Sequence, residues 1–313
     1  MARGKAEATL ELIEEMRLIL EKIEPASVRA VCYQLFVNGL IPSMAKSVTN
    51  GVGVQLRYAR EHGIILWEWV VDETREAERW AGWDDKEEFK RSMLNSYRRN
   101  RWVTQPIRIE VWSEKGTVRG TVMPVLEEYG IQFRVHHGFS SVTILHDIVV
   151  AQQQSKVPLI VLYAGDWDPS GRYMVEVDLP QRLEKLWNEN WIARSPAPRS
   201  VARYLRPPAF NITIVPVALT ARDCQRLPSF PAKRTDTRYK WYIERYGHRA
   251  WELDALSPAI LRRRVERAIL RQGIDWEAWK RVGRCEQAEQ ASLENVLGEW
   301  QRITENISMP APK

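Results

Sequence analysis

The segment from Lys156 to Gly171 constrains the fold of this 313-residue chain more than any other stretch. Its apolar run, Val157 to Tyr163, has the length of one strand and shows no alternation with polar residues, which is typical of a strand buried on both faces. Gly165 ends the run, and Pro169 and Gly171 add turn residues directly after it. A strand of this kind belongs to a parallel sheet that is covered by helices.

Strand-like and helix-like segments alternate along the middle of the chain. The other strand-like segments are residues 107–113, 131–136 and 212–218, and helical patterns cover residues 117–129, 142–153 and about 172–190. Such alternation predicts a parallel α/β sheet with right-handed crossover connections.

Acidic residues follow two of the expected strands. Asp166 and Asp168 follow the buried strand, and Glu114 follows the strand at 107–113. If the two strands are neighbours, the three carboxylates meet at the edge where parallel sheets bind ligands. Their repulsion favours a cation, and their oxygen ligands suit Mg²⁺ or Mn²⁺. The alternative for an Asp-x-Asp sequence is a loop with two solvated acids. Glu110, inside the strand at 107–113, is either a further acid of this cluster or a structural acid paired with a cation.

Three helical patterns precede this region and cover residues 6–23, 28–37 and about 47–62. A strand-like run at 64–71 follows them. This is the order of a winged helix-turn-helix domain, whose third helix enters the major groove of DNA. That helix presents Arg57 and Arg60. In the second helix, the helical angle places Tyr33 away from the apolar face and one turn from Arg29. Tyr33 is therefore either a surface tyrosine or a nucleophile beside a cation.

The net charge of +6 favours an anionic partner, and nucleic acid first. Basic residues concentrate in the runs Arg98-Arg99-Asn100-Arg101 and Arg262-Arg263-Arg264, although a solvated basic surface explains the same runs. The three cysteines have no metal-type spacing, which predicts neither disulfides nor zinc fingers and fits a reducing cytoplasm. There is no signal-peptide pattern and no apolar run of membrane-spanning length, so we expect no membrane partner.

Two motifs carry a resemblance to a known family. Glu114-Lys115-Gly116 after one strand, and Gly165-Asp-Trp-Asp-Pro-Ser-Gly171 after a later one, resemble a Toprim domain. The sequences of these two motifs are most similar to those of the A subunit of archaeal topoisomerase VI and of its meiotic double-strand-break relative. In that family a winged-helix domain comes first and carries the nucleophilic tyrosine in an Arg-x-x-aromatic-Tyr segment. Arg29-Ala-Val-Cys-Tyr33 matches its arginine and tyrosine, with Cys32 where the family often has a second tyrosine.

The resemblance implies an α/β fold with three consecutive parts. These are a winged helix-turn-helix domain at 1–104, a Rossmann-like Toprim domain with a mostly parallel sheet at 105–256, and a helical C-terminal extension at 257–313. It also implies a DNA-cleaving transesterase dependent on Mg²⁺ or Mn²⁺. Tyr33 would form a 5′-phosphotyrosyl link to DNA, assisted by Arg29, with the metal on Glu114, Asp166 and Asp168.

In this family the tyrosine of one protomer meets the metal of the other, which implies a homodimer on double-stranded DNA. An ATPase B-type subunit is a further partner, and nothing in the sequence resembles it. The expected location is the cytoplasm, at the nucleoid, in a prokaryote, plasmid or phage context. Two alternatives stay open. One is a Toprim nuclease that hydrolyses DNA while Tyr33 is only structural, and the other is a non-catalytic winged-helix DNA-binding protein.

The remaining candidate residues fall into two groups. Glu252 and Asp254 lie in a segment that resembles the end of a Toprim domain, and they are either additional metal ligands or structural acids before a helix. The candidate DNA contacts are Arg57, Arg60, Arg98, Arg99 and Arg101.

Overall fold

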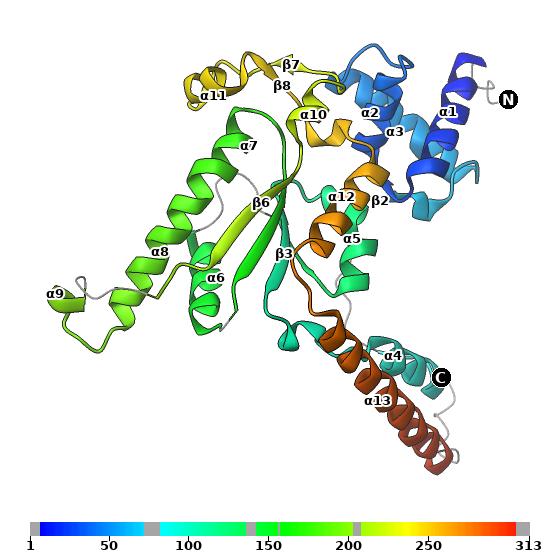
Figure 1. Cartoon of the computed structure of the whole chain (residues 1–313). Helices are drawn as coiled ribbons and strands as arrows, with labels where there is room; N and C mark the ends of the chain where they lie inside the picture. Colours follow the sequence, from blue (N-terminus) through cyan, green and yellow to red (C-terminus); the bar gives the residue numbers. More distant parts are fainter. Residues whose placement is uncertain (1–6, 72–81, 136–141, 156, 203–207, 305–313) are drawn as a thin grey trace, which may run out of the picture. The chain divides into compact units, whose positions relative to one another are not determined.

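The computed structural model describes residues 7–71, 82–135, 142–155, 157–202 and 208–304 (Figure 1). The chain forms two compact units, each built from two separate stretches. The first comprises Met1–Arg75 and Ile107–Gln272, and the second Glu76–Pro106 and Gly273–Lys313. This grouping differs from three consecutive domains, because the C-terminal helices are divided between the two units.

A four-stranded parallel sheet lies at the centre of the first unit, in the order β4-β3-β5-β6. The strands are β3 (Arg108–Ser113), β4 (Gln132–Val135), β5 (Leu159–Ala164) and β6 (Ile212–Ala218). The predicted parallel sheet is confirmed, although residue 136 of the expected second strand lies outside the described residues. β3 and β5 are neighbours, and Ser113 pairs with Ala164 at their ends. Glu114 and Asp166 therefore lie just beyond the carboxyl ends of two adjacent strands, at the same edge of the sheet.

Helices cover both faces of this sheet (Figure 1). On one face, α6 (Val142–Gln154) and α8 (Leu179–Arg194) bury Leu145, Leu183 and Trp187 against alternate residues of β5. α5 (Val118–Tyr129) and α12 (Pro258–Leu270) cover the other face. α5 ends at Gly130, whose φ of 59° is in the left-handed region that favours glycine. The burial of β5 on both faces explains its uninterrupted apolar sequence.

Three helices form a second core in the first unit: α1 (Glu7–Ile23), α2 (Val28–Val37) and α3 (Lys46–Glu61). Buried aliphatic side chains of all three meet there, among them Met16, Val31 and Leu56. The Ser27 hydroxyl accepts a hydrogen bond from the Ala30 amide at 3.2 Å and caps α2. The positions predicted for these helices agree with the structure to within about two residues.

The strand expected at 64–71 is mostly wrong. Only β2 (Val70–Val71) is extended and paired, and Trp67–Trp69 forms a 3-10 turn, η1. The partner of β2 is β1 (Ala26–Ser27), which lies parallel to it. β1 has two residues because α2 begins immediately afterwards, so a longer β2 would have no strand to pair with.

The first unit also contains several short elements. They are α7 (Pro169–Tyr173), the π-helical turn η3 (Met174–Asp178), α9 (Arg199–Ala202), α10 (Ala221–Cys224), β7 (Phe230–Pro231), α11 (Tyr239–Tyr246), β8 (Arg249–Ala250) and the 3-10 turn η4 (Leu253–Ala255). β7 and β8 form an antiparallel pair.

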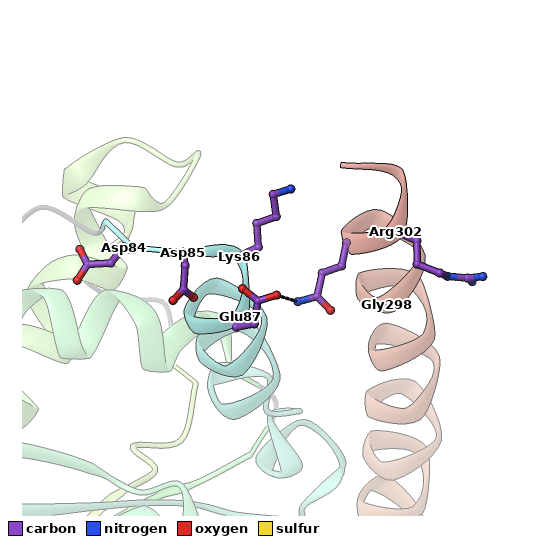
Figure 2. A pocket seen from close by; sticks show the side chains of 7 residues that line it. Asp84, Asp85, Lys86, Glu87, Gly298 and Arg302 are labelled. Atoms are coloured by element: carbon purple, nitrogen blue, oxygen red, sulfur yellow. Dashed lines mark hydrogen bonds between the residues drawn. The ribbon is translucent and has the colours of Figure 1, made fainter. Parts of the chain in front are cut away.

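The second unit consists of α4 (Lys86–Ser96), the 3-10 turn η2 (Arg101–Thr104) and α13 (Trp276–Ile303). α4 packs along α13, and the Gln105 side chain exchanges hydrogen bonds with the main chain of Asp275 at 2.9 and 3.2 Å. A pocket of about 420 Å³ lies between the start of α4 and the end of α13, where Glu87 contacts Gln301 (Figure 2). Among the described helices of the chain, none is long and apolar enough to cross a membrane.

Candidate functional site

The turn after β5 is shaped by two glycines. A Cβ atom on Gly171 would lie 2.5 Å from the main-chain oxygen of Asp166, and one on Gly165 would lie 2.5 Å from the Tyr163 ring. The Asp168 carboxylate accepts a hydrogen bond from the Gly171 amide at 2.7 Å and caps α7. Close packing therefore explains the glycines of the motif and holds both aspartates at the end of β5.

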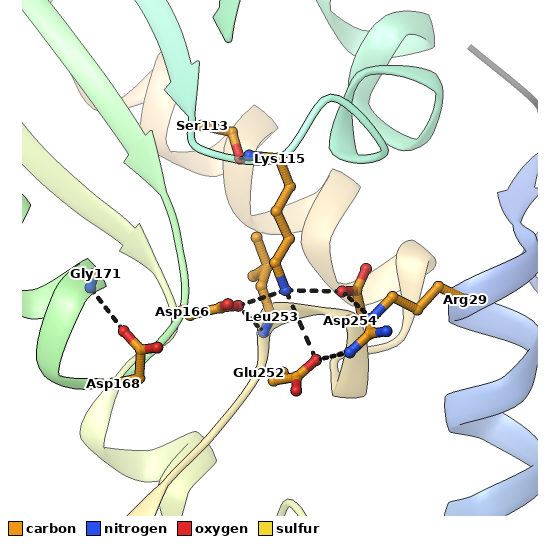
Figure 3. A network of polar contacts seen from close by, with 9 residues as sticks. All are labelled: Arg29, Ser113, Lys115, Asp166, Asp168, Gly171, Glu252, Leu253 and Asp254. Carbon is orange, nitrogen blue, oxygen red and sulfur yellow. Dashed lines mark hydrogen bonds and ion pairs between the residues drawn. The ribbon is translucent and has the colours of Figure 1, made fainter. Parts of the chain in front are cut away.

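Asp166 is the anchor of a polar network at this edge (Figure 3). Its side chain is only 9% exposed. One of its oxygens accepts a hydrogen bond from the Leu253 amide at 2.6 Å and lies 2.9 Å from the Lys115 ammonium. Main-chain hydrogen bonds of 2.9 Å in both directions between Trp167 and Trp251 hold the segment before η4 against the turn.

Lys115 lies at the centre of this network, although the sequence analysis quoted it only within a motif and assigned it no role. Its ammonium lies 2.8 Å from Asp254 as well as 2.9 Å from Asp166, and 3.9 Å from Glu252. Burial disfavours its charge, but the two aspartates prevail and hold the pKa of Lys115 above its ordinary value. The sequence signal that could have identified Lys115 as part of this network was its position directly after Glu114, at the end of a strand.

The three predicted metal acids interact with one another. Burial, followed by the charges of Asp166 and Asp168, raises the pKa of Glu114 to about 8. Burial also raises the pKa of Asp168 to about 6, against the opposing effect of the Gly171 amide, and the charge of Asp166 adds to it. The structure thus brings Glu114, Asp166 and Asp168 together, as expected if β3 and β5 are neighbours, and their role as metal ligands stays a prediction.

The donor chemistry of this cluster fits a hard divalent cation, because its possible ligands are carboxylate oxygens and the charge of Lys115 only partly offsets their repulsion at Glu114. Their present side-chain positions are a different matter. Over the part of the chain that the structure describes, no three Asp, Glu, His or Cys side chains are arranged around one common point as metal ligands. Lys115 is the cation in contact with Asp166 here.

α2 brings Arg29 to the same network from the helical core (Figure 3). The Arg29 guanidinium forms an ion pair with Glu252, and its Nε lies 3.1 Å from Asp254. Glu252 and Asp254 are therefore the ion-pair partners of Arg29 and Lys115 in this structure. Arg29 also lies 5.7 Å from the centre of the Tyr33 ring.

Tyr33 does not occupy the exposed position that its helical angle suggests. Its side chain is 0% exposed. The angle correctly separates it from the core of α1, α2 and α3, but residues far along the chain cover it, with the Phe230 ring edge-on at 6.5 Å. Its hydroxyl has no hydrogen-bond partner of good geometry among the described residues, although Glu252 is close. Burial and the Glu252 charge raise the pKa of Tyr33, so the phenol is neutral in this arrangement.

The candidate DNA-binding arginines have different surroundings. Arg57 on α3 is 70% exposed, with Glu61 at 4.0 Å. Arg60 donates to the Trp67 carbonyl at 2.9 Å and stacks on the Trp67 ring. In the second unit, three arginines contact groups of that unit: Arg98 donates to the Tyr97 carbonyl, Arg99 pairs with Glu289, and Arg101 pairs with Glu286.

Glu110 is a structural acid. Its side chain is 2% exposed and lies 2.6 Å from Arg134 and 3.3 Å from Arg108. It also accepts a hydrogen bond from the Trp112 indole at 2.8 Å. Among the described residues, its hydrogen bonds and ion pairs all come from the sheet, so the structure resolves the two interpretations of Glu110 in favour of the paired one.

Comparison of the chain with protein-family models, with characterised proteins and with solved structures finds no match in any of the three.

Proposed function

We propose that the chain is a Mg²⁺-dependent DNA-cleaving transesterase of the type IIB topoisomerase A-subunit kind, with a winged-helix part and a Toprim domain. One observation carries the proposal. The interacting carboxylates Glu114, Asp166 and Asp168 follow the ends of adjacent parallel strands. Beside them, Arg29 of α2 pairs with Glu252 and Asp254 and lies close to Tyr33. An acidic metal centre and a nucleophile with a neighbouring cation are the two parts that this chemistry requires.

Glu114, Asp166 and Asp168 would hold Mg²⁺ or Mn²⁺. When bound, such an ion supplies Lewis-acid polarisation of the phosphate and neutralises the charge that develops in the reaction. The raised pKa of Glu114 supports this role, since a group of acids that repel one another gains from a cation. Lys115 contacts both Asp166 and Asp254, so it keeps a partner when Asp166 turns to another cation.

Tyr33 would be the nucleophile. Its phenolic oxygen forms a bond to the phosphorus of a DNA phosphodiester, and the bond from phosphorus to the 3′ oxygen breaks. The phenolic proton passes to a carboxylate, and Glu252, which lies close to the hydroxyl, would accept it. The leaving oxygen gains a proton from water to become a 3′-hydroxyl. Arg29 stabilises the negative charge during attack. Because Tyr33 has no exposed surface, the cover that includes Phe230 has to open before DNA reaches it.

Double-stranded DNA is the proposed substrate and a homodimer the proposed acting form. Each chain carries a single candidate tyrosine, and a double-strand break needs one nucleophile for each strand. Strand passage would need energy from an ATPase B-type subunit. We propose cleavage as the activity of this chain, with passage depending on such a partner.

A metal-dependent nuclease is the second candidate. The burial of Tyr33 and the raised pKa of its hydroxyl favour this alternative, in which water attacks and Tyr33 is structural. The ion pairs that Lys115 and Arg29 form with the acids favour a third role, a non-catalytic winged-helix DNA-binding protein.

Supercoiled DNA with Mg²⁺ or Mn²⁺ separates the three. We expect wild-type protein to give broken DNA with protein attached at its 5′ ends after denaturation, and Tyr33→Phe and Asp166→Ala to give neither. Tyr97→Phe, in the second unit, is the matched control and should behave as wild type. Breakage without an adduct, unchanged in Tyr33→Phe, would establish the nuclease. DNA binding that does not depend on Mg²⁺, together with no DNA breakage in either Mg²⁺ or Mn²⁺, would establish the non-catalytic role.

A further inference from the structure

One of the most basic stretches of the chain is residues 226–249, which we call the basic segment. It contains seven Lys or Arg residues and two acids, a net charge of +5, whereas the whole chain carries +6. The second unit, with twelve basic and thirteen acidic residues, carries −1. The charge excess that predicts a nucleic-acid partner is therefore located in the first unit, and this segment is one of its main sources.

Several cations of the basic segment are available to a ligand, Arg226 among them. Lys233, Arg234 and Lys240 are exposed, and within the described ranges no hydrogen bond or ion pair involves their side chains. Arg249, by contrast, donates to both the hydroxyl and the carbonyl of Ser229 and so stabilises the β7–β8 pair. Exposed cations without partners bind phosphates at low cost, because no internal ion pair has to be broken.

The basic segment is attached firmly beside the candidate site. α11 packs on α7, which begins at the Asp168 cap. The Tyr242 hydroxyl, on α11, donates to the Arg249 carbonyl at 2.7 Å and lies 3.1 Å from the Trp167 carbonyl, inside the Asp-x-Asp turn. At the other end of the segment, Phe230 contacts the rings of Tyr33 and Phe36. The segment thus extends from the candidate nucleophile to the candidate metal acids.

The surface chemistry favours DNA over a membrane. Peripheral membrane binding combines basic residues with apolar side chains that insert into the lipid. None of the described large apolar side chains between residues 226 and 249 is exposed; Tyr242 is fully buried, and Trp241 and Tyr246 pack against aromatic neighbours. A surface that offers cations without apolar side chains to insert fits the sugar-phosphate backbone of a duplex.

We propose that the basic segment binds the phosphate backbone of double-stranded DNA through Lys233, Arg234 and Lys240, and directs a strand to the acids after β5. The role as a guide to the acids rests on the proposed cleavage function, whereas the binding itself does not. These side chains position DNA without reading its sequence, since phosphate contacts carry no base information.

The test measures equilibrium binding of the full chain to a short fluorescent duplex over a range of NaCl concentrations. Tyr33→Phe protein in EDTA is used throughout, so that cleavage does not interfere. The triple variant Lys233→Gln, Arg234→Gln, Lys240→Gln should lower the slope of log K against log salt by about 2.7, at roughly 0.9 per phosphate contact. At about 0.1 M salt, we expect its Kd to rise at least tenfold, by the same relation.

A matched control removes three exposed cations from the second unit, in the variant Arg91→Gln, Arg281→Gln, Arg284→Gln. Its slope and Kd should stay at the parent values. The proposal is overturned if the first variant keeps the parent slope, or if both variants lose binding equally, which would show a general charge effect. It is also overturned if the first variant loses only its binding to phosphatidylserine vesicles. Lost duplex binding in a protein that never cleaves DNA would support the surface while removing the proposed enzyme.

Discussion

Gly171→Ala tests the packing of the Asp-x-Asp turn. The added methyl group would lie 2.5 Å from the main-chain oxygen of Asp166 and 3.2 Å from a carboxylate oxygen of Asp168. The first contact is closer than a carbon and an oxygen approach, and its partner is backbone, so the turn itself has to move. Overpacking of this kind costs about 1–3 kcal/mol in the free energy of unfolding. For a unit of this size, that corresponds to a fall in Tm of about 2–12 °C.

Gly51→Ala is the matched control, since it makes the same chemical change in the exposed part of α3, where nothing lies within 4 Å of the new methyl group. Alanine favours a helix over glycine, so this variant should gain about 0.5–1 kcal/mol. Thermal and urea unfolding, followed by circular dichroism, give both values. A Gly171→Ala protein as stable as wild type, beside a normal Gly51→Ala response, would refute the packing described for this turn.

Three further predictions concern ion pairs of the first unit. Arg29→Met should lower the free energy of unfolding by at most about 1 kcal/mol, because the Arg29 side chain is 44% exposed. DNA cleavage, measured beside an Arg281→Met control at an exposed arginine of the second unit, should fall by about 10²-fold or more if Arg29 stabilises the reacting phosphate. Glu110→Ala should cost about 3 kcal/mol in urea unfolding, because it leaves Arg134 without its buried partner. A loss of stability no larger than that of the exposed Arg281→Met control would contradict this. Although burial opposes it, Arg264 holds the pKa of Asp223 below its ordinary value. The stabilisation is therefore complete above the pKa of the unfolded aspartate, near 4, and is lost as pH falls below it. Asp223→Asn should lower stability at neutral pH and flatten its decline in acid, and an unchanged acid limb would rule out this pair as a source of the decline.

Local sequence patterns were sufficient for much of the fold. The apolar run of β5 and the helical spacing around it predicted a parallel sheet, and the positions of Glu114 and Asp166 after two of its strands predicted that they meet if those strands are neighbours, as the structure shows them to be. These predictions worked because strand burial, helix amphipathicity and turn glycines are properties of a few consecutive residues. The strand at 64–71 failed because pairing needs a partner, and β1 offers only two residues.

The tertiary structure alone decided the rest of the site. Arg29 meets Glu252 and Asp254 across more than 220 residues of sequence, and no periodicity in either segment encodes that contact. The same folding covers Tyr33 from outside its own helical core, and places the Lys115 ammonium between Asp166 and Asp254. The sequence by itself determined the sheet and the edge at which its acids gather. Which charges neutralise those acids, and whether the tyrosine is open to solvent, depended on the packing of distant segments against that edge, because burial and pairing belong to the assembled chain.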